Sequence, residues 1–419
     1  MSYRVHTVSS PVDAVVRPPG SKSETIRALT EAALADGRSH LYSPLEADDP
    51  WAMAGALRAL GVDVSTESEP WGVDGRAGRL EPPAVDLDAN ESGLSARILI
   101  ALAGSLDGPS RIVGRGRLPE RPMDGIVAVL RSQGVEVDGE RLPILVSGRG
   151  HLWGGRIEVD CSLSSQFATA VMLVAPVMHE PCTLDLKGLT GSAAYLDGTA
   201  SIMRRFGAAV ERTVTGFEIS NQGYLASDVV IVPDASAAVY PMAVAAITGG
   251  RVRIEGLGED TWQPDMRVAT ALEAMGCSVT WESQSIEVDA RDVSLDGVDL
   301  DMSEAPDGAL ALAVVCLFAT GPSRLSGLGS LRHKESDRLD AISSELRRVG
   351  GGAVVDGDAL EVTPGDLHGA EVDPHGDHRI AMAMATAGTR VPGIWVNEPG
   401  VVDKTWPGFW EGLEALTGG

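Results

Sequence analysis

Aromatic residues, cysteine and positive charge are scarce in this chain, and each scarcity excludes a kind of protein. Only 4% of its 419 residues are Phe, Trp or Tyr, whereas 44% are hydrophobic, so the interior must be packed mainly with Ala, Val, Leu and Gly. The 34 lysines and arginines are outnumbered by 59 aspartates and glutamates, which leaves a net charge of −25. So acidic a chain is not expected to bind nucleic acid or anionic membranes through general charge attraction.

The cysteines and histidines lack the spacing of disulfide frameworks or metal sites. Four cysteines stand in apolar surroundings with no C-x-x-C pair among them: Cys161, Cys182, Cys277 and Cys316. We expect them to be reduced, buried thiols. The eight histidines are scattered along the chain, so the sequence predicts neither a metal nor a cofactor.

Targeting and membrane signals are also missing. The first residues, MSYRVHTVSSP, lack the charged and then apolar layout of a signal peptide. The longest apolar stretches, 167–178 and 309–320, are too short to cross a bilayer. These absences predict a soluble, cytoplasmic protein.

Two familiar catalytic motifs are absent as well. Gly20 is followed by Ser21, Lys22 and Ser23, but no glycine precedes it at the spacing of the phosphate loop G-x-x-x-x-G-K-[ST]. No G-x-S-x-G nucleophile elbow occurs either. A nucleoside triphosphatase and a serine hydrolase are therefore disfavoured.

The chain instead contains a sequence repeat of about 70 residues, present in six copies. Each copy begins with an apolar helix that a small or polar residue opens and Gly or Pro closes. A short strand, an amphipathic second helix and one or two further strands follow. The first helices are expected to begin near Ser21, Ser92, Ser164, Asp234, Ala305 and Gly376. A repeated α/β unit of this kind buries its apolar face against its own copies.

Six α/β units divide naturally into two similar domains of three. We expect the first domain over residues 18–233. The second is expected over 234–419 together with 1–17, because the N-terminal strand YRVHTV is able to pair back into it. The chain would then pass between the domains twice.

The basic residues of this acidic chain gather in the loops where helices begin. Lys22, Ser23 and Arg27 stand at the first helix, and a Gly-rich turn at a helix N-terminus is a good anion site. Taken alone, that loop is explained as well by a helix that Ser23 caps, with its cations solvated, as by an anion-binding site. Cations also stand in the loops of other copies: Arg115, Arg117, Arg121, Arg332, Lys334, Arg338, Arg379 and Lys404. Such an array suits a small ligand with several anionic groups.

Two acids stand among these cations. Asp307 and Glu335 add the capacity for acid–base chemistry. Taken by itself, Asp307 in APDGALAL is better explained as the cap of a helix than as a catalytic base.

Eight segments, in order, resemble the 5-enolpyruvylshikimate-3-phosphate synthases, also called 3-phosphoshikimate 1-carboxyvinyltransferases. The segments are PPGSKSETIRAL, RLPERPMDGIVAVL, SSQF, PDASAAVY, APDGALALAV, LRHKESDRLDAISSELRRVGG, GDHRIAMAMA and DKTWPGFW. The resemblance runs from Pro18 to Trp410, essentially the whole chain. It implies an α/β fold of two similar domains, each of three βαβαββ repeats in an inside-out α/β barrel, with a cleft between the domains.

The resemblance also implies a reaction. The 5-hydroxyl of shikimate 3-phosphate attacks C2 of phosphoenolpyruvate, and the tetrahedral intermediate then loses phosphate to leave the enol ether that precedes chorismate. The expected partners are these two small substrates, without a cofactor, nucleic acid or membrane. The protein is expected to act as a monomer.

Matching positions imply the site residues. The resemblance assigns shikimate 3-phosphate to Lys22, Ser23, Arg27, Ser164, Ser165, Gln166, Ser192, Tyr195, Asp307 and Lys334. It assigns phosphoenolpyruvate to Lys22, Gly93, Arg121, Gln166, Arg338, Arg379 and Lys404. Asp307 is implied as the base toward the 5-hydroxyl, and Lys22 and Glu335 as candidates for delivering a proton to the methylene carbon.

Three positions depart from the family pattern. Glu91 stands where the family usually has Asn, near the phosphoenolpyruvate site, and must either point away or pair with a neighbouring cation. The usual Ser-Asn-Arg is here Thr25-Ile26-Arg27, and Ser330 replaces an Asn. These changes bear on fine geometry and on glyphosate sensitivity, and they leave the reaction class unaltered.

Two alternatives stay open. A sister enolpyruvyl transferase acting on another hydroxyl, such as that of UDP-N-acetylglucosamine, typically has Lys-Asn in place of Lys22-Ser23 and a Cys in the loop 115–121. Neither feature is found here, although a paralogue that uses a shikimate-like phosphate still fits. The other alternative is a non-catalytic binder of small anions, which the intact acid–base residues disfavour.

Overall fold

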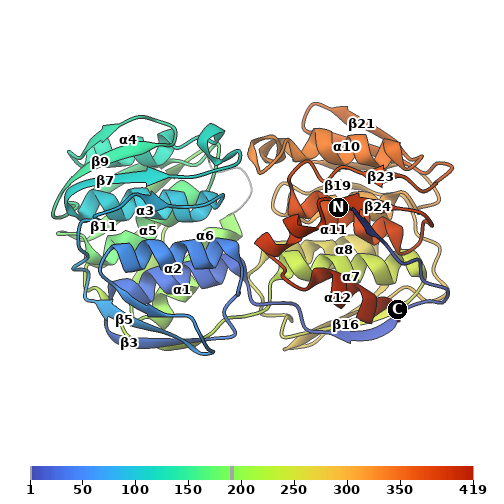
Figure 1. Cartoon of the computed structure of the whole chain (residues 1–419), viewed down its shortest axis with the longest axis horizontal. Coiled ribbons are helices and arrows are strands. Elements are labelled where there is room, and N and C mark those ends of the chain that lie inside the picture. The colour runs from blue at the N-terminus through green and yellow to red at the C-terminus, as the bar shows by residue number, and fades with distance from the viewer. Residues whose placement is uncertain (1, 189–192, 419) are drawn as a thin grey trace. The chain divides into compact units, whose positions relative to one another are not determined.

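The computed structural model of the chain describes residues 2–188 and 193–418, and Figure 1 shows it as a ribbon. Helices and strands alternate along the chain, which confirms the predicted α/β fold class. The chain forms two compact units: unit 1 consists of Met1–Pro19 and Pro233–Gly419, and unit 2 of Gly20–Val232. Within the described residues, no helix has the length and apolar character that a membrane crossing requires.

Unit 2 contains three copies of the repeat. The first copy comprises α1 (Lys22–Leu34), β3 (Ala35–Tyr42), α2 (Asp48–Ala59), β4 (Asp63–Ser65), β5 (Trp71–Arg76) and β6 (Leu87–Asp88). The second comprises α3 (Gly93–Ser105), β7 (Asp107–Val113), α4 (Asp124–Ser132), β8 (Glu136–Asp138), β9 (Ile144–Arg149) and β10 (Gly155–Asp160). The third comprises α5 (Gln166–Val174), β11 (Cys182–Lys187), α6 (Ala193–Arg205), β12 (Val210–Arg212), β13 (Gly216–Ile219), β14 (Tyr224–Leu225) and β15 (Asp228–Val230).

Unit 1 repeats the same order after two N-terminal strands, β1 (Ser2–Arg4) and β2 (Asp13–Val16). The fourth copy comprises α7 (Ala235–Thr248), β16 (Arg251–Glu255), α8 (Arg267–Ala274), β17 (Ser278–Trp281), β18 (Ser285–Asp289) and β19 (Asp299–Asp301). The fifth comprises α9 (Ala309–Cys316), β20 (Ser323–Ser326), α10 (Arg338–Arg348), β21 (Gly352–Asp356), β22 (Ala359–Thr363) and β23 (Glu371–Val372). The sixth comprises α11 (His378–Gly388), β24 (Trp395–Asn397) and α12 (Phe409–Thr417).

One pairing rule builds the sheets. The strand that follows the first helix of a copy, such as β7, pairs in parallel with the last strand of the preceding copy and antiparallel with a later strand of its own copy. The resulting order β6-β7-β9-β8 recurs in β10-β11-β13-β12 and in β19-β20-β22-β21. The repeat in the sequence is therefore a repeat of whole small sheets, each covered by its own helices.

The first sheet of each unit is completed by a strand from a distant part of the chain. In unit 2, β14 and β15 return from the third copy to pair with β3. In unit 1, β2 pairs with β16. The sheet of the sixth copy gains β1, with Ser2 opposite Asn397. The N-terminal segment is thus built into the sheets of unit 1.

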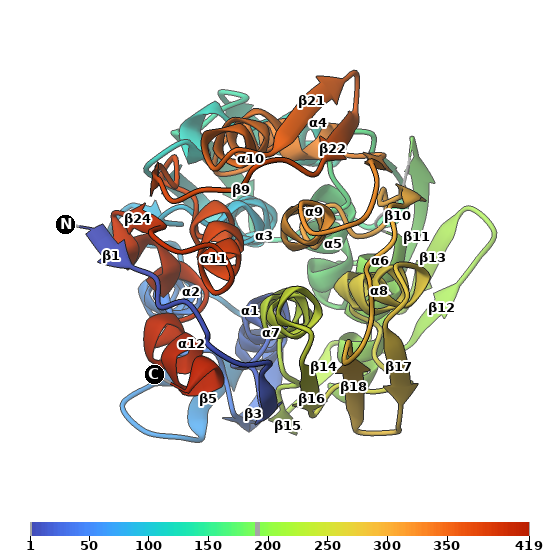
Figure 2. The same ribbon diagram turned by 90° about the vertical axis from the view of Figure 1, so that its right-hand side faces the viewer.

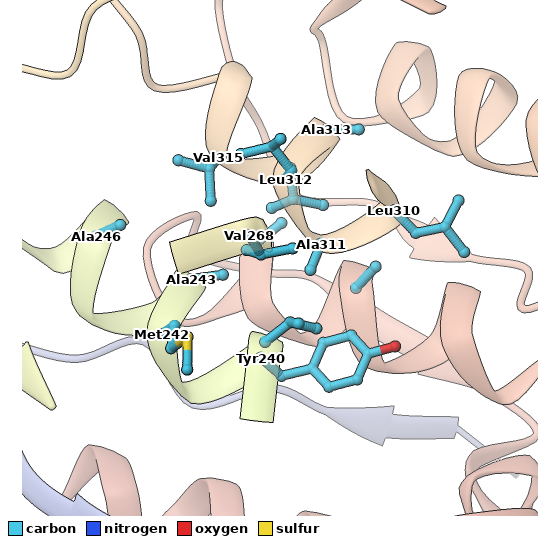
Figure 3. Close-up of a cluster of buried hydrophobic side chains, with 14 of the residues drawn as sticks. Tyr240, Met242, Ala243, Ala246, Val268, Leu310, Ala311, Leu312, Ala313 and Val315 are labelled. Carbon is cyan, nitrogen blue, oxygen red and sulfur yellow. The ribbon is translucent and has the colours of Figure 1, made fainter. Parts of the chain in front are cut away.

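The core of unit 1 lies around three apolar helices, α7, α9 and α11, which pack against one another. In Figure 2 these helices are seen nearly end-on, with the strands lying outside them. Every residue of α9 is buried, and Figure 3 shows Ala311 of this helix close to Val268 of α8 and Ala243 of α7. Alanines at many contact positions, such as Ala243 and Ala311, let the helix backbones approach closely, which suits a chain with few aromatic residues.

Candidate active site

The first predicted anion loop opens α1 in unit 2. Ser21 is the N-cap, and its hydroxyl accepts a hydrogen bond from the backbone N–H of Glu24. Ser23 is therefore not the cap, and the alternative that assigned it only to capping is wrong. Lys22 and Ser23 are the first two residues of the helix, where the backbone N–H groups favour an anion.

Arg27, one turn later, is buried and held by hydroxyl groups. Its Nε donates to Thr199 Oγ1 at 2.8 Å, and its Nη2 to Thr169 Oγ1 at 3.4 Å. Its Nη1 donates to the carbonyl of Ser23 at 2.8 Å. Burial lowers the pKa of Arg27 to about 10, and the carboxyl of Glu31 is the strongest influence that raises it. The guanidinium is thus held in place by hydrogen bonds to neutral oxygens, with the carboxyl groups of Glu31 and Glu24 nearby.

Gln166, the first residue of α5, is oriented by an arginine. Its Oε1 accepts from Nη1 of Arg97 at 2.6 Å, and Arg97 also donates to the carbonyls of Gly93 and Pro122. The Arg97 guanidinium lies over the ring of Phe167, 5.0 Å from its centroid. Arg97 therefore connects the start of α3 with the start of α5.

Arg121 packs against the N-terminus of α3. A Cβ built on Gly93, the first residue of that helix, would lie 2.6 Å from Arg121 Cζ, so only glycine lets the guanidinium lie so close. Arg121 is buried. A cation and the N-terminus of a helix meet there, which is a favourable place for a phosphate or carboxylate.

Glu91 reaches toward the same arginine-bearing loop. A Cβ on Gly116 would meet Glu91 Oε1 at 2.5 Å, and Gly116 has a φ of +58°. The loop that carries Arg121 therefore rests against the Glu91 side chain. Glycine at position 116 is required both by this contact and by its backbone conformation.

The predicted phosphate-binding serines lie near the starts of α5 and α6. Ser165 is the N-cap residue of α5 and is buried, and Ser164 Oγ accepts from the backbone N–H of Gln166 at 3.2 Å. Tyr195 is the third residue of α6 and is half-buried. Ser192 lies outside the described residues.

Unit 1 brings together six of the predicted residues around the start of α10. Arg338 is at the centre, with a side chain only 2% exposed. Its Nη1 lies 2.7 Å from Asp307 Oδ1, and its Nη2 lies 2.9 Å from Glu335 Oε2. Glu335 also lies 3.6 Å from Lys404 Nζ. One buried guanidinium thus organises both acids of the predicted catalytic set.

Asp307 is surrounded by cations. Besides Arg338, its oxygens lie 3.4 Å from Lys334 Nζ and 3.6 Å from Arg379 Nη2. Burial by itself raises the pKa of the Asp307 carboxyl, but the three cations outweigh burial, so the pKa lies well below its usual value. The N-cap of α9 is Gly308. The interpretation of Asp307 as a helix cap is therefore wrong.

A family model described as EPSP synthase (3-phosphoshikimate 1-carboxyvinyltransferase) matches residues 6–413. The chain belongs to the EPSP synthase family. A 3-phosphoshikimate 1-carboxyvinyltransferase from Methanoculleus marisnigri is 41% identical over 97% of both chains. Another from Methanosphaerula palustris is 38% identical, again over 97% of each. The resemblance noted from the eight segments is thereby confirmed.

Solved structures agree with the fold of this EPSP synthase family member. An EPSP synthase from Acinetobacter baumannii superimposes with a TM-score of 0.82 at 25% identity, covering 99% of this chain and 98% of that one. The enolpyruvyl transferase NikO from Streptomyces tendae superimposes with a TM-score of 0.78 over 99% and 97%. At 18% identity, the second likeness supports the fold alone.

Sequence reasoning missed the buried carboxylates that hold the cations of this EPSP synthase family member. Asp377 accepts from Arg338 Nε at 2.7 Å and from Nη2 at 3.1 Å, and Ser336 donates to it at 3.0 Å. Asp49 pairs with Lys22. Asp377 also caps α11, and capping was the only role that its place in the sequence suggested. Arg97 was not among the predicted site residues either, because its contact with Gln166 is visible only in the fold.

Proposed function

We propose that this chain transfers the enolpyruvyl group of phosphoenolpyruvate to the 5-hydroxyl of shikimate 3-phosphate and releases phosphate. This is the transferase reaction of the shikimate pathway that leads to chorismate and the aromatic amino acids. The observation that carries the proposal is the match of the 3-phosphoshikimate 1-carboxyvinyltransferase family model to residues 6–413. The cation clusters of both units support it, because both substrates carry several negative charges.

Residues of unit 2 take the shikimate side of the reaction. Arg27 and Ser23 bind the shikimate carboxylate, for which the fixed guanidinium of Arg27 is suited. Tyr195 packs against the ring, and Gln166 bridges the two substrates. The substrate phosphate is bound by Ser164, Ser165 and Ser192.

A second set of residues is assigned to phosphoenolpyruvate. Arg338 and Arg379 bind its carboxylate, because planar guanidinium groups match carboxylate geometry. Its phosphate is bound by Lys22, Arg121, Gly93 and Lys404, with Gln166 as the bridge to the other substrate. Lys334 contacts the shikimate hydroxyls near Asp307.

Asp307 takes the proton of the 5-hydroxyl as its oxygen attacks C2, while Lys22 or Glu335 delivers a proton to the methylene carbon. Before substrate binds, the surrounding cations hold the pKa of Asp307 low, which makes it a weak base. A phosphoenolpyruvate carboxylate shared between Arg338 and Arg379 draws these cations away from Asp307. The base therefore gains strength when the second substrate is present.

The protein works as a monomer in the cytoplasm. All four cysteines are buried free thiols, which suits a reducing compartment. Size-exclusion chromatography with light scattering checks the oligomeric state: the expected mass is that of one 43.8 kDa chain.

The deciding experiment measures phosphate release from phosphoenolpyruvate with shikimate 3-phosphate as the acceptor. Turnover with this acceptor and none with UDP-N-acetylglucosamine is expected. Binding of either substrate without turnover would instead favour the small-anion binder, and turnover only with another hydroxyl compound would favour the paralogue.

The same assay tests the assigned base. We expect Asp307→Ala to lower kcat by about 100-fold or more, the usual contribution of a general base. Calorimetric binding of shikimate 3-phosphate should remain measurable, because Ser23 and Arg27 are untouched. A rate near that of the unmodified protein would remove the role of Asp307.

A further inference from the structure

Asp49 is a buried carboxylate whose charge is met by Lys22. Its Oδ2 lies 3.1 Å from Lys22 Nζ, and its side chain is 1% exposed, against 17% for Lys22. Apart from the Lys22 ammonium, neither oxygen of Asp49 has a hydrogen-bond donor among the described residues. A buried carboxylate is costly unless it is paired. The ion pair with Lys22 is therefore the contact that allows Asp49 to be buried as an anion.

Backbone contacts fix the distance between the two residues. A Cβ on Gly20 would lie 2.3 Å from the carbonyl oxygen of Ser43, so the turn before α1 lies directly on the segment that leads into α2. Thr25 Oγ1 accepts from the backbone N–H of Leu45 at 3.0 Å and donates to the carbonyl of Ser21 at 2.8 Å. The start of α1 and the approach to α2 are thus joined on both sides of Lys22.

We propose that Asp49 is a positioning residue, which holds the Lys22 ammonium in one orientation at the start of α1 for an anionic substrate. The proposal rests on the proposed function only in taking that substrate to be phosphoenolpyruvate. A lysine side chain has four flexible carbons, and a fixed partner restricts its rotamers before the ligand arrives. The ammonium has three N–H donors. The ion pair with Asp49 fixes the direction in which the ammonium points.

The chain offers a matched control. Asp48 is the neighbouring residue in the first turn of α2, but it is exposed. Both carboxylates face the helix dipole in the same way. Asp48→Asn and Asp49→Asn therefore each remove one negative charge from the first turn of α2. Only Asp49→Asn removes the carboxylate that pairs with Lys22.

The kinetic test compares these two variants. Asp49→Asn is expected to raise the KM for phosphoenolpyruvate by about 10- to 100-fold, the loss typical of a misplaced binding group, and Asp48→Asn by less than about twofold. Combined with Lys22→Ala, Asp49→Asn should add no further loss, because it acts through a side chain already removed. Additive losses, or an unchanged KM in Asp49→Asn, would overturn the proposal.

A second measurement needs no substrate and separates this proposal from the proposed function. The sequence contains only four lysines, Lys22, Lys187, Lys334 and Lys404, so reductive ¹³C-methylation gives few NMR signals, and Lys22→Arg identifies the one from Lys22. Loss of the neighbouring carboxylate should move the chemical shift of that signal toward the signal of the exposed Lys187 in Asp49→Asn and leave it in place in Asp48→Asn.

An unaltered position of the Lys22 signal in Asp49→Asn would overturn the proposal whatever the activity of the protein. If the unmodified chain shows no turnover while the Lys22 signal moves as expected, the proposed function is overturned instead. If Asp49→Asn does not fold, Asp49→Glu replaces it: the longer side chain should raise the KM by several-fold, and a KM equal to that of the unmodified protein contradicts the proposal.

Discussion

At the scale of single residues, carboxylates decide how the cations of this protein meet a ligand. Arg338 is engaged by Asp377, Asp307 and Glu335 before any substrate is present. An anion bound by Arg338, as we propose, would share a guanidinium that is already ordered, which would lower the entropic cost of binding. The three carboxylates would weaken the attraction between Arg338 and such an anion, but they fix the direction of its guanidinium.

Glu31 is a different kind of buried acid. It lies on α1 with both carboxylate oxygens lacking a hydrogen bond among the described residues. Burial raises its pKa well above the usual value, against the opposite influence of Arg27 and Arg205. Because the folded protein binds this proton more tightly than the unfolded chain does, its contribution to stability is complete below the unfolded pKa and is lost as the pH rises toward the folded pKa.

We therefore predict that the unfolding free energy of Glu31→Gln falls less steeply than that of the unmodified protein between about pH 5 and pH 7.5. Each unit of pKa elevation that falls in this window corresponds to about 1.4 kcal/mol. Urea unfolding at several pH values measures the effect. The exposed Glu46→Gln serves as the control and should follow the unmodified protein. Parallel curves for Glu31→Gln and the unmodified protein would show that Glu31 is not protonated in the fold.

The sequence predicted the cations of the site better than their partners. Lys22, Arg121 and Arg338 stand out in an acidic chain, and their family segments gave each a role that stays a prediction until ligands are tested. Asp49 and Asp377 have the same chemistry as dozens of surface acids. Only the packing of distant helices distinguishes them, since burial is a property of the fold and no local pattern encodes it.

At the scale of elements, glycine controls how closely the helix starts approach other parts of the chain. Gly20 touches the backbone of Ser43, and Gly93 touches the guanidinium of Arg121. A side chain at position 20 would overlap the Ser43 backbone, and one at position 93 would overlap the Arg121 guanidinium.

Gly20→Ala is predicted to destabilise the protein by about 1–3 kcal/mol, the usual cost of overpacking. The new methyl group would push the turn away from Ser43 and shift Lys22 relative to Asp49, so the KM for phosphoenolpyruvate should rise as well. Gly55→Ala is the matched control, because a Cβ at Gly55, inside α2, meets nothing within 4 Å. It should be neutral or stabilise by up to about 1 kcal/mol. Equal urea midpoints for the two variants would contradict the prediction.

Helices were predictable where their caps are local. Ser21, Ser92 and Asp234 are the N-caps of α1, α3 and α7, at the expected positions. The fifth copy differs: its helix was expected near Ala305 and begins at Ala309, after turns that place Asp307 outside the helix. Pairing of the N-terminal strand with the second domain was expected from the sequence. Its register with β24, and the pairing of β14 and β15 with β3, could not be inferred from local pattern, because strand pairing joins segments that are far apart in sequence.

At the scale of the whole molecule, the two units differ in how the chain builds them. Unit 2 is one continuous segment, Gly20–Val232, whereas unit 1 combines Met1–Pro19 with Pro233–Gly419. At the division, the N–H of Ser21 donates to the carbonyl of Val232, and the N–H of Asp234 donates to that of Pro19. The two ends of the continuous unit are therefore adjacent.

Fragments should reflect this difference. Residues 20–232 are predicted to fold alone, with one cooperative urea transition. Residues 233–419 lack β1 and β2, so the edges of β24 and β16 are exposed, and this fragment should aggregate. Joining residues 1–19 to it through a flexible linker should restore solubility and a cooperative transition. A soluble, cooperatively folding 233–419 fragment would show that the N-terminal strands are dispensable.

The pairing of β2 with β16 and of β1 with β24 also determines when these strands are able to fold during translation. Ser2 leaves the ribosome long before its partner Asn397. At roughly 5–20 residues per second, β1 and β2 remain without partners for tens of seconds, while the continuous unit is completed behind them. During that interval the nascent chain carries two strand edges that chaperones are able to recognise. A segment that is made before the continuous unit is thus folded after it.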